Sequence, residues 1–233
     1  MLPYFYTISS FFFLAIWFVL YIFLPQCRRS IFWTSWNFAP AGPITEYWHY
    51  SEYWYPPYLV DIIIGNWHFG VEDYILAFSI AGISSAIFEI LAFKKGLENI
   101  PAVSAKTYFK MKFCGVIGFG LMIIIASVGL NSMIAIILTM AIVALIIQYR
   151  HLNIFSLAIR GAVIFTIIYW LYFIILLIPI FPSVIKTYWN LKTTCGIRLT
   201  GIPIEEFIWA FFACLFAGPV YRVCSTKTLF GKY

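Results

Sequence analysis

Two long apolar runs of this 233-residue chain begin with nearly the same string, EDYILAF at residues 72–78 and EEFIWAF at residues 205–211. The two strings start 133 positions apart, and four of their seven aligned positions are identical. Carboxylates are expensive to keep beside hydrocarbon, so acidic residues at such places usually have a function. The repeated string indicates an internal duplication. Its acidic members are Glu72, Asp73, Glu205 and Glu206.

The composition is that of a membrane protein. Hydrophobic residues make up 63% of the chain, charged residues only 10%, and the mean hydropathy is +0.93. A membrane-spanning helix needs about 20 mostly apolar residues. Seven such runs occur, at residues 4–24, 31–50, 71–93, 113–130, 132–149, 157–181 and 202–224. We therefore expect an all-α integral membrane protein, a seven-transmembrane-helix bundle in which residues 1–233 form a single membrane domain.

The basic residues orient this bundle. With seven spans, Lys186, Lys192 and Arg198 fall on one side of the membrane. The other twelve lysines and arginines fall on the side of the C-terminus: Arg28, Arg29, Lys94, Lys95, Lys106, Lys110, Lys112, Arg150, Arg160, Arg222, Lys227 and Lys232. The positive-inside rule then places the C-terminus in the cytoplasm and the N-terminus outside the plasma membrane. The net charge of +6 reflects this orientation, and we expect no nucleic-acid partner.

The duplication extends beyond the acidic string, because the same shift places the second apolar run roughly on the sixth and the first on the fifth. We expect repeat unit one at residues 1–93, an inserted helix at about 112–130 and repeat unit two at residues 132–224. Four helices precede unit two, so this is a parallel internal repeat of three helices that brings both acidic pairs to the same depth. The shift also aligns Glu89 with Arg222, either as an ion pair or as two side chains that reach separately toward the interface.

The second apolar run contains Pro40, Gly42 and Pro43 near its middle. These residues free backbone groups that lipid cannot satisfy, so we expect a kinked helix that is buried and lines a cavity. Asn37 and Glu46 are the polar groups that such a cavity would expose. Hydrogen bonding between helices is the simpler role for Asn37.

The acidic residues suit acid–base chemistry. In an adjacent pair, repulsion favours one shared proton, so that one carboxyl is protonated while its neighbour is ionised. Capping of helix ends at the interface is the alternative. Aromatic residues make up 21% of the chain, and rings near the acidic pairs could hold a cationic intermediate, although an interfacial aromatic belt explains them equally well. The candidate rings are Trp209, Phe207, Tyr74 and Phe78.

No motif of the sequence indicates a metal or a nucleotide. His49 and His68 lie near Glu46 and Glu72, but their spacing is not that of a metal site, and no aspartate-rich string is present. A glycine-rich phosphate loop is also missing from the sequence. We therefore expect no metal and no cofactor.

Three segments resemble the lycopene cyclase domain family: PIEEF at residues 203–207, VEDY at residues 71–74 and PITEYW at residues 43–48. The members of this family are small integral-membrane carotenoid cyclases built from paired three-helix units. The resemblance implies an intramolecular lyase, an isomerase, that cyclises the acyclic ends of lycopene without redox change. It also points to both acidic pairs as essential. The missing proline before the first pair and the extra helix mark the chain as a divergent member.

We therefore expect a cofactor-independent membrane cyclase or isomerase that acts by acid–base carbocation chemistry on a carotenoid such as lycopene or a related polyprenoid. The expected acid is Glu205 or Glu206, and the expected base or charge partner is Glu72, Asp73 or Glu46. The expected substrate-binding residues are Trp209, Phe207, Tyr74, Phe78 and Asn37. The expected partners are the lipid bilayer and a hydrophobic polyene or lipid substrate, and a homo-oligomer is compatible with the sequence. The alternatives are a non-catalytic carotenoid-binding, lipid-binding or assembly protein and a small proton-coupled transporter.

Overall fold

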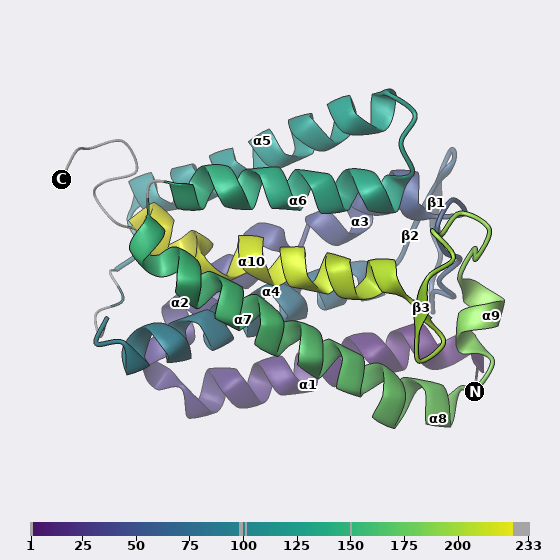
Figure 1. Cartoon of the computed structure of the whole chain (residues 1–233), viewed down its shortest axis with the longest axis horizontal. Coiled ribbons are helices and arrows are strands. Elements are labelled where there is room, and N and C mark those ends of the chain that lie inside the picture. The colour runs from purple at the N-terminus through teal and green to yellow at the C-terminus, as the bar shows by residue number, and fades with distance from the viewer. Residues whose placement is uncertain (1, 98–99, 101, 150, 226–233) are drawn as a thin grey trace.

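The structure, a computed structural model, is a bundle of helices that lie side by side along its long axis (Figure 1). It describes residues 2–97, 100, 102–149 and 151–225. Three of the basic residues that orient the chain lie outside the described residues: Arg150, Lys227 and Lys232.

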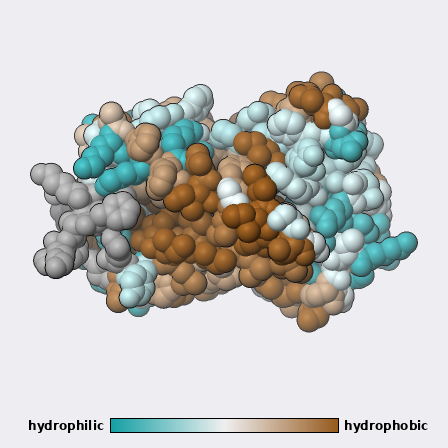
Figure 2. Space-filling view, turned by 90° about the horizontal axis from the view of Figure 1, so that it is seen from above, coloured by the Kyte–Doolittle hydropathy of each residue, from teal (hydrophilic) through white to brown (hydrophobic). Residues whose placement is uncertain are grey.

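Among the described residues, six helices are long and apolar enough to cross a membrane. They are built on α1 (Phe5–Phe23), α4 (Val71–Lys94), α5 (Ala105–Ser127), α6 (Ser132–Tyr149), α7 (Leu152–Leu171) and α10 (Ile204–Ser225). The 3-10 turns Leu2–Tyr4 and Pro25–Cys27 flank α1, and α7 continues through a π-helical turn, Tyr172–Leu177, into α8 (Ile178–Ile180). Apolar residues cover the middle of one face of the molecule, and hydrophilic residues gather toward its ends (Figure 2). The predicted all-α membrane class is therefore confirmed.

The predicted second span, residues 31–50, is not one helix. The structure divides it into α2 (Arg28–Phe38) and α3 (Ala41–His49), which follow one another along the bundle (Figure 1). Pro40 and Pro43 lack the N–H groups that would bond one turn back, so the helical ladder is interrupted there. The expected kink is present, whereas seven uninterrupted spans are not confirmed.

The fourth predicted span, residues 113–130, begins earlier in the structure, because α5 starts at Ala105. Ser104 Oγ accepts a hydrogen bond from Thr107 N at 3.0 Å and so caps the helix. The first eight residues of α5 contain three lysines, which interrupt the apolar run, so the start of the helix could not be predicted from it.

Two short β-hairpins lie at one end of the bundle (Figure 1). β1 (Ile62–Ile64) pairs antiparallel with β2 (Trp67–Phe69), with Ile62 opposite Phe69. β3 (Arg198–Leu199) pairs antiparallel with β4 (Ile202–Pro203), with Arg198 opposite Pro203. The short helix α9 (Val184–Tyr188) lies at the same end. Each hairpin leads directly into a helix whose first turn carries an acidic pair, α4 or α10.

The loops that precede the two hairpins meet each other. Trp54 and Trp189 form an isolated antiparallel bridge, and the centroids of their rings are 5.5 Å apart. Tyr55 N donates a hydrogen bond to Tyr188 O at 2.8 Å. These contacts join two segments that are far apart in the sequence at the hairpin end of the bundle.

α4 and α10 form the centre of the bundle, where they pack against each other. Gly218 of α10 allows the close approach, because a Cβ there would lie 3.3 Å from Ser84 O and 3.3 Å from Phe88 Cβ. At the end away from the hairpins, Arg222 Nε donates to Glu89 Oε2 at 3.0 Å, and both side chains are buried. Of the two roles expected for this aligned pair, the structure shows the ion pair.

Candidate functional site

A cavity of about 230 Å³ lies inside the bundle, mainly between α3, α4, α5, α6 and α10. Its lining is mostly apolar and aromatic, with three carboxyl groups. These groups belong to Glu46 on α3, Asp73 on α4 and Glu206 on α10, and all three residues are buried. Among the described residues, no lysine or arginine lines the cavity. An apolar cavity with a few convergent polar groups is the usual form of a ligand site, so this is the candidate functional site.

Each of the two central helices turns one face toward the cavity. The α4 residues of this face are Asp73, Leu76, Ala77, Ile80 and Ala81, and the α10 residues are Glu206, Trp209, Ala213, Phe216 and Ala217. These positions recur with the three-to-four-residue period of a single helix face. In each helix the second acid of the pair therefore begins the cavity face, and the first acid lies about 100° round the helix from it.

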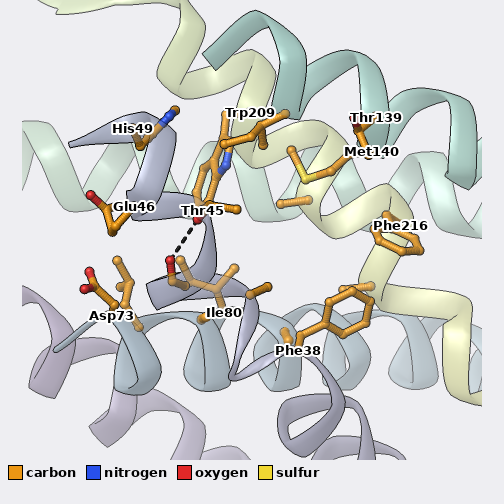
Figure 3. A pocket seen from close by; sticks show the side chains of 18 of the residues that line it. Phe38, Thr45, Glu46, His49, Asp73, Ile80, Thr139, Met140, Trp209 and Phe216 are labelled. Carbon is orange, nitrogen blue, oxygen red and sulfur yellow. Dashed lines mark hydrogen bonds between the residues drawn. The ribbon is translucent and has the colours of Figure 1, made fainter. Parts of the chain in front are cut away.

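Glu46 and Asp73 lie next to one another at one end of the cavity (Figure 3). Tyr6 Oη donates to Asp73 Oδ1 at 2.5 Å, and Gly70 N donates to Asp73 Oδ2 at 2.9 Å. Trp54 Nε1 lies 3.2 Å from each carboxyl oxygen of Glu46. Asp73 thus has two separate donors, whereas Glu46 shares one indole N–H between its two oxygens.

Close packing of α3 on α4 brings Glu46 and Asp73 together. Gly42 permits this packing, because a Cβ at Gly42 would collide with the carbonyl oxygen of Asp73 and lie 3.2 Å from Ala77 Cβ. Thr45 Oγ1 donates a hydrogen bond to Gly42 O at 2.8 Å and so satisfies a backbone carbonyl in the first turn of α3.

Glu206 accepts hydrogen bonds from two aromatic side chains. Trp189 Nε1 donates to Glu206 Oε1 at 2.7 Å, and Tyr169 Oη donates to Oε2 at 3.0 Å. Because an indole N–H can only donate, Oε1 must act as an acceptor. The bridge between Trp54 and Trp189 therefore joins the donors of two cavity carboxyl groups, Glu46 and Glu206.

Two tyrosines of the loop after α3, the buried Tyr53 and the partly buried Tyr58, lie beside the carboxyl groups. Burial, followed by the charge of Glu206, raises the pKa of Tyr53 well above its ordinary value. Burial, followed by the charge of Glu46, raises the pKa of Tyr58 in the same way. Both phenols therefore stay protonated at neutral pH, so that neutral hydroxyl groups rather than further negative charges lie beside the carboxyl groups.

The first acid of each pair lies outside the cavity and holds a loop. Leu59 N donates to Glu72 Oε1 at 2.8 Å, and Cys195 N donates to Glu205 Oε1 at 2.5 Å. In each glutamate the other carboxyl oxygen is buried, with no hydrogen-bond partner in the part of the chain that the structure describes. Of the five expected catalytic residues, these two glutamates therefore do not face the cavity.

The five expected substrate-binding residues are divided in the same way. Trp209 and Asn37 line the cavity. Phe207 is buried in the core, Tyr74 is exposed, and the ring of Phe78 packs against Trp17 with centroids 4.9 Å apart. Tyr74 and Phe78 lie one turn apart on α4, on a face that the cavity does not reach.

The polar aromatic side chains around the carboxyl groups, which come from α1, α7 and the loops, were not predicted from the sequence. They are Tyr6, Tyr53, Trp54, Tyr58, Tyr169 and Trp189. No spacing in the sequence links these residues to the acids. A helical count from Asp73 and from Glu206, in contrast, would have identified the cavity faces of α4 and α10.

The two histidines that were considered as metal ligands lie in different places. His49 lines the cavity, and its Nδ1 is 2.9 Å from Ser132 Oγ. His68 pairs with Asp61 Oδ2 at 2.9 Å in the hairpin region. Among the described residues, no three His, Cys, Asp or Glu side chains are grouped so as to hold a metal ion. That the protein uses neither a metal nor a cofactor stays a prediction.

Comparison with known proteins points to one family. The family model of lycopene cyclase matches residues 131–224, a stretch that includes α6, α7 and Glu206. This match is consistent with a member of the lycopene cyclase domain family, as the resemblance in the sequence predicted. No curated protein and no solved structure matches the chain.

Proposed function

Since residues 131–224 match the lycopene cyclase family, we propose that this protein is a membrane cyclase of the isomerase class. It closes a ring at an acyclic end of a carotenoid such as lycopene, or of a related polyprenoid, and it needs no cofactor. One observation carries the proposal: three buried carboxyl groups from three helices line a single apolar cavity. Ring closure by proton transfer requires an acid, a base and a water-poor surface around the cationic intermediate.

The proposed reaction conserves atoms and electrons. The acid transfers its proton to one carbon of a C=C bond, which leaves a carbocation. The electron pair of a second C=C bond then attacks this carbocation and forms the ring. A base removes a proton beside the new cationic carbon and restores a double bond. The product is an isomer of the substrate, so the reaction consumes no oxidant or reductant.

We assign the acid role to Glu46. Its oxygens share one indole N–H, whereas Asp73 and Glu206 each accept two separate donors, and such hydrogen bonds favour the ionised form. Because Glu46 lies beside Asp73, one proton on this pair relieves the repulsion between two charges. Glu46 holds that proton, because its carboxyl group accepts hydrogen bonds from fewer donors than that of Asp73. The assignment reverses the sequence expectation that Glu205 or Glu206 is the acid.

Glu206 is then the base or the charge partner of the cation. Trp209 lines the cavity one turn along the same face of α10, and its ring is 5.8 Å from the ring of Tyr169. Aromatic faces attract cations within about 6 Å of the ring centroid. In the proposed reaction these two rings, which line the cavity beside Glu206, stabilise the positive charge of the intermediate.

We further propose that the site is built from two parallel repeat units. Each unit contributes a short hairpin followed by a helix, α4 or α10. The first acid of that helix accepts a loop N–H, and the second acid faces the cavity. Parallel units place both second acids at the same end of the bundle, and α5 is the inserted helix between them. The hairpin end lies outside the plasma membrane in this proposal, and the basic end lies in the cytoplasm.

Ring formation from lycopene tests the proposed function. The wild-type protein and Glu46→Gln are each placed in lipid nanodiscs with lycopene, and the products are separated by chromatography. The wild-type protein should yield a cyclic product of unchanged mass, and Glu46→Gln should yield roughly a hundredfold less or lower still. A wild-type protein that binds lycopene without changing it would be a carotenoid-binding protein and not a cyclase.

A further inference from the structure

α5 forms the wall of the cavity that faces the lipid. Gly115, Gly118, Phe119 and Met122 line the cavity, while much of the rest of this helix is exposed. α5 packs on α6 and α10 but only loosely on α3, although α3 lines the same cavity. The cavity is therefore well enclosed by α4 and α10 and only loosely covered between α3 and α5.

The two ends of the cavity differ in chemistry. Figure 3 shows Glu46, Asp73 and His49 at one end and Phe38 and Phe216 at the other. The rings of Phe38 and Phe216 are 4.9 Å apart, and they close the apolar end. A ligand with one reactive end and a long apolar remainder matches this arrangement.

The cavity is too small to enclose a whole carotenoid. Its volume of about 230 Å³ lies below the roughly 300–1,000 Å³ of pockets that enclose drug-sized ligands. A linear carotenoid is longer than such a ligand, so only one of its ends fits inside. The rest of the chain needs a path to the lipid.

Two glycines leave part of the α5 wall, beside Phe119 and Met122, without a side chain. A Cβ at Gly118 would meet no atom within 4 Å, and the nearest atom to a Cβ at Gly115 is Asn37 Nδ2 at 4.0 Å. Neither glycine has a positive φ, so the backbone does not require glycine at these positions. Glycine inside a helix is also less favourable than alanine. The two glycines therefore indicate space that is kept open beside the cavity.

We propose that the cavity binds one end of a linear polyprenoid and that the rest of the chain leaves the protein between α3 and α5, past Gly118, into the lipid. The inference rests on the proposed function, because it takes the substrate to be a long apolar chain with a reactive end. That end lies at Glu46 and Asp73, and the neighbouring part of the chain lies along Phe38 and Phe216. A substrate with two equal ends is therefore cyclised at one end at a time.

A matched pair of glycines on α5 tests this path. Gly118 lines the cavity, whereas Gly120 is exposed on the same helix, and a Cβ at either position meets no atom within 4 Å. Gly118→Phe fills the path, so it should lower both the lycopene bound in nanodiscs and the rate of ring formation by about tenfold or more. Bound lycopene is read from its visible absorbance. Gly120→Phe should keep both quantities near the wild-type values, and equal melting temperatures of the two variants would exclude misfolding.

A substrate that is blocked at one end tests the path separately from the size of the cavity. A lycopene derivative with a bulky dye at one end should bind and form a single ring at its free end, because the blocked end stays in the lipid. If the wild-type protein cyclises lycopene but does not bind this derivative, the path is overturned and the cyclase proposal stands.

The glycine variants separate the remaining outcomes. A Gly118→Phe protein that binds and cyclises lycopene like the wild type would overturn the path. If the wild type binds lycopene, loses binding in Gly118→Phe and never forms a ring, the path stands and the cyclase proposal fails. A wild-type protein that does not bind lycopene would overturn both.

Discussion

Glu206→Gln, with Glu205→Gln as its control, tests which acid of the second pair acts in the cavity. Both glutamates are buried in the first turn of α10, but only Glu206 lines the cavity. Glutamine keeps the shape of the side chain and removes its charge and its capacity to take up a proton. Loss of general acid–base assistance lowers a rate by roughly 10²–10⁴-fold. This corresponds to about 2.7–5.4 kcal/mol of transition-state stabilisation.

The fold should tolerate both changes. In Glu206→Gln the amide oxygen can still accept the indole N–H of Trp189, and Tyr169 can turn its hydroxyl to accept from the amide. In Glu205→Gln the amide oxygen can still accept from Cys195 N. Each hydrogen bond changes from charged to neutral, so we expect a loss of about 1 kcal/mol in the free energy of unfolding for Glu205→Gln, which has one such bond, and about 2 kcal/mol for Glu206→Gln, which has two. Both losses are smaller than the expected effect of Glu206→Gln on the reaction.

The assay is the initial rate of ring formation in nanodiscs, with thermal unfolding of both variants measured alongside. Glu206→Gln should be slower than the wild type by about a hundredfold or more. Glu205→Gln should stay close to the wild-type rate, because its side chain holds only a loop. Equal losses in the two variants would refute the assignment by helix face, and a fully active Glu206→Gln protein would refute the role of Glu206.

Three further substitutions probe the packing around the site. Arg222→Leu leaves Glu89 buried without its positive partner and should lower the free energy of unfolding by about 3–5 kcal/mol. Adding Glu89→Gln removes the buried negative charge and should recover part of this loss, as measured by thermal unfolding. No recovery in the double variant would contradict the ion pair. Gly42→Leu should slow ring formation, because its Cβ would meet the Asp73 carbonyl and separate α3 from α4; a normal rate would argue against that close approach. Tyr6→Phe removes a donor to Asp73 that is worth about 1.5–3 kcal/mol, so an unchanged melting temperature would speak against this hydrogen bond.

Most of the membrane architecture could be predicted because apolar runs and prolines act locally. The runs predicted the spanning helices to within a few residues, apart from the start of α5, where lysines interrupt the apolar pattern. Pro40 and Pro43 predicted a kink, since each removes a backbone donor. The sequence did not reveal that the two prolines together divide the span into two helices.

The site was harder to predict because it depends on helix rotation and on contacts between distant segments. The repeated acidic string lies on the two helices that carry Asp73 and Glu206. In each pair only the second acid faces the cavity, and that depends on which face of the helix packs inward. Tyr6 and Asp73 are 67 residues apart, and Tyr169 and Glu206 are 37 residues apart. Donors of this kind are brought to the carboxyl groups only by tertiary packing.

The bridge between Trp54 and Trp189 bears on the kind of product that the cavity can release. It lies at the hairpin end, where the two indoles cover Glu46 and Glu206. A carbocation that meets water is quenched to an alcohol, whereas one that is kept dry loses a proton and becomes an alkene. In the proposed reaction the two indoles keep water away from the carbocation, so the product is a hydrocarbon rather than a hydroxylated carotenoid. A variant that admits water past these indoles would form tertiary alcohols, which would appear among its pigments.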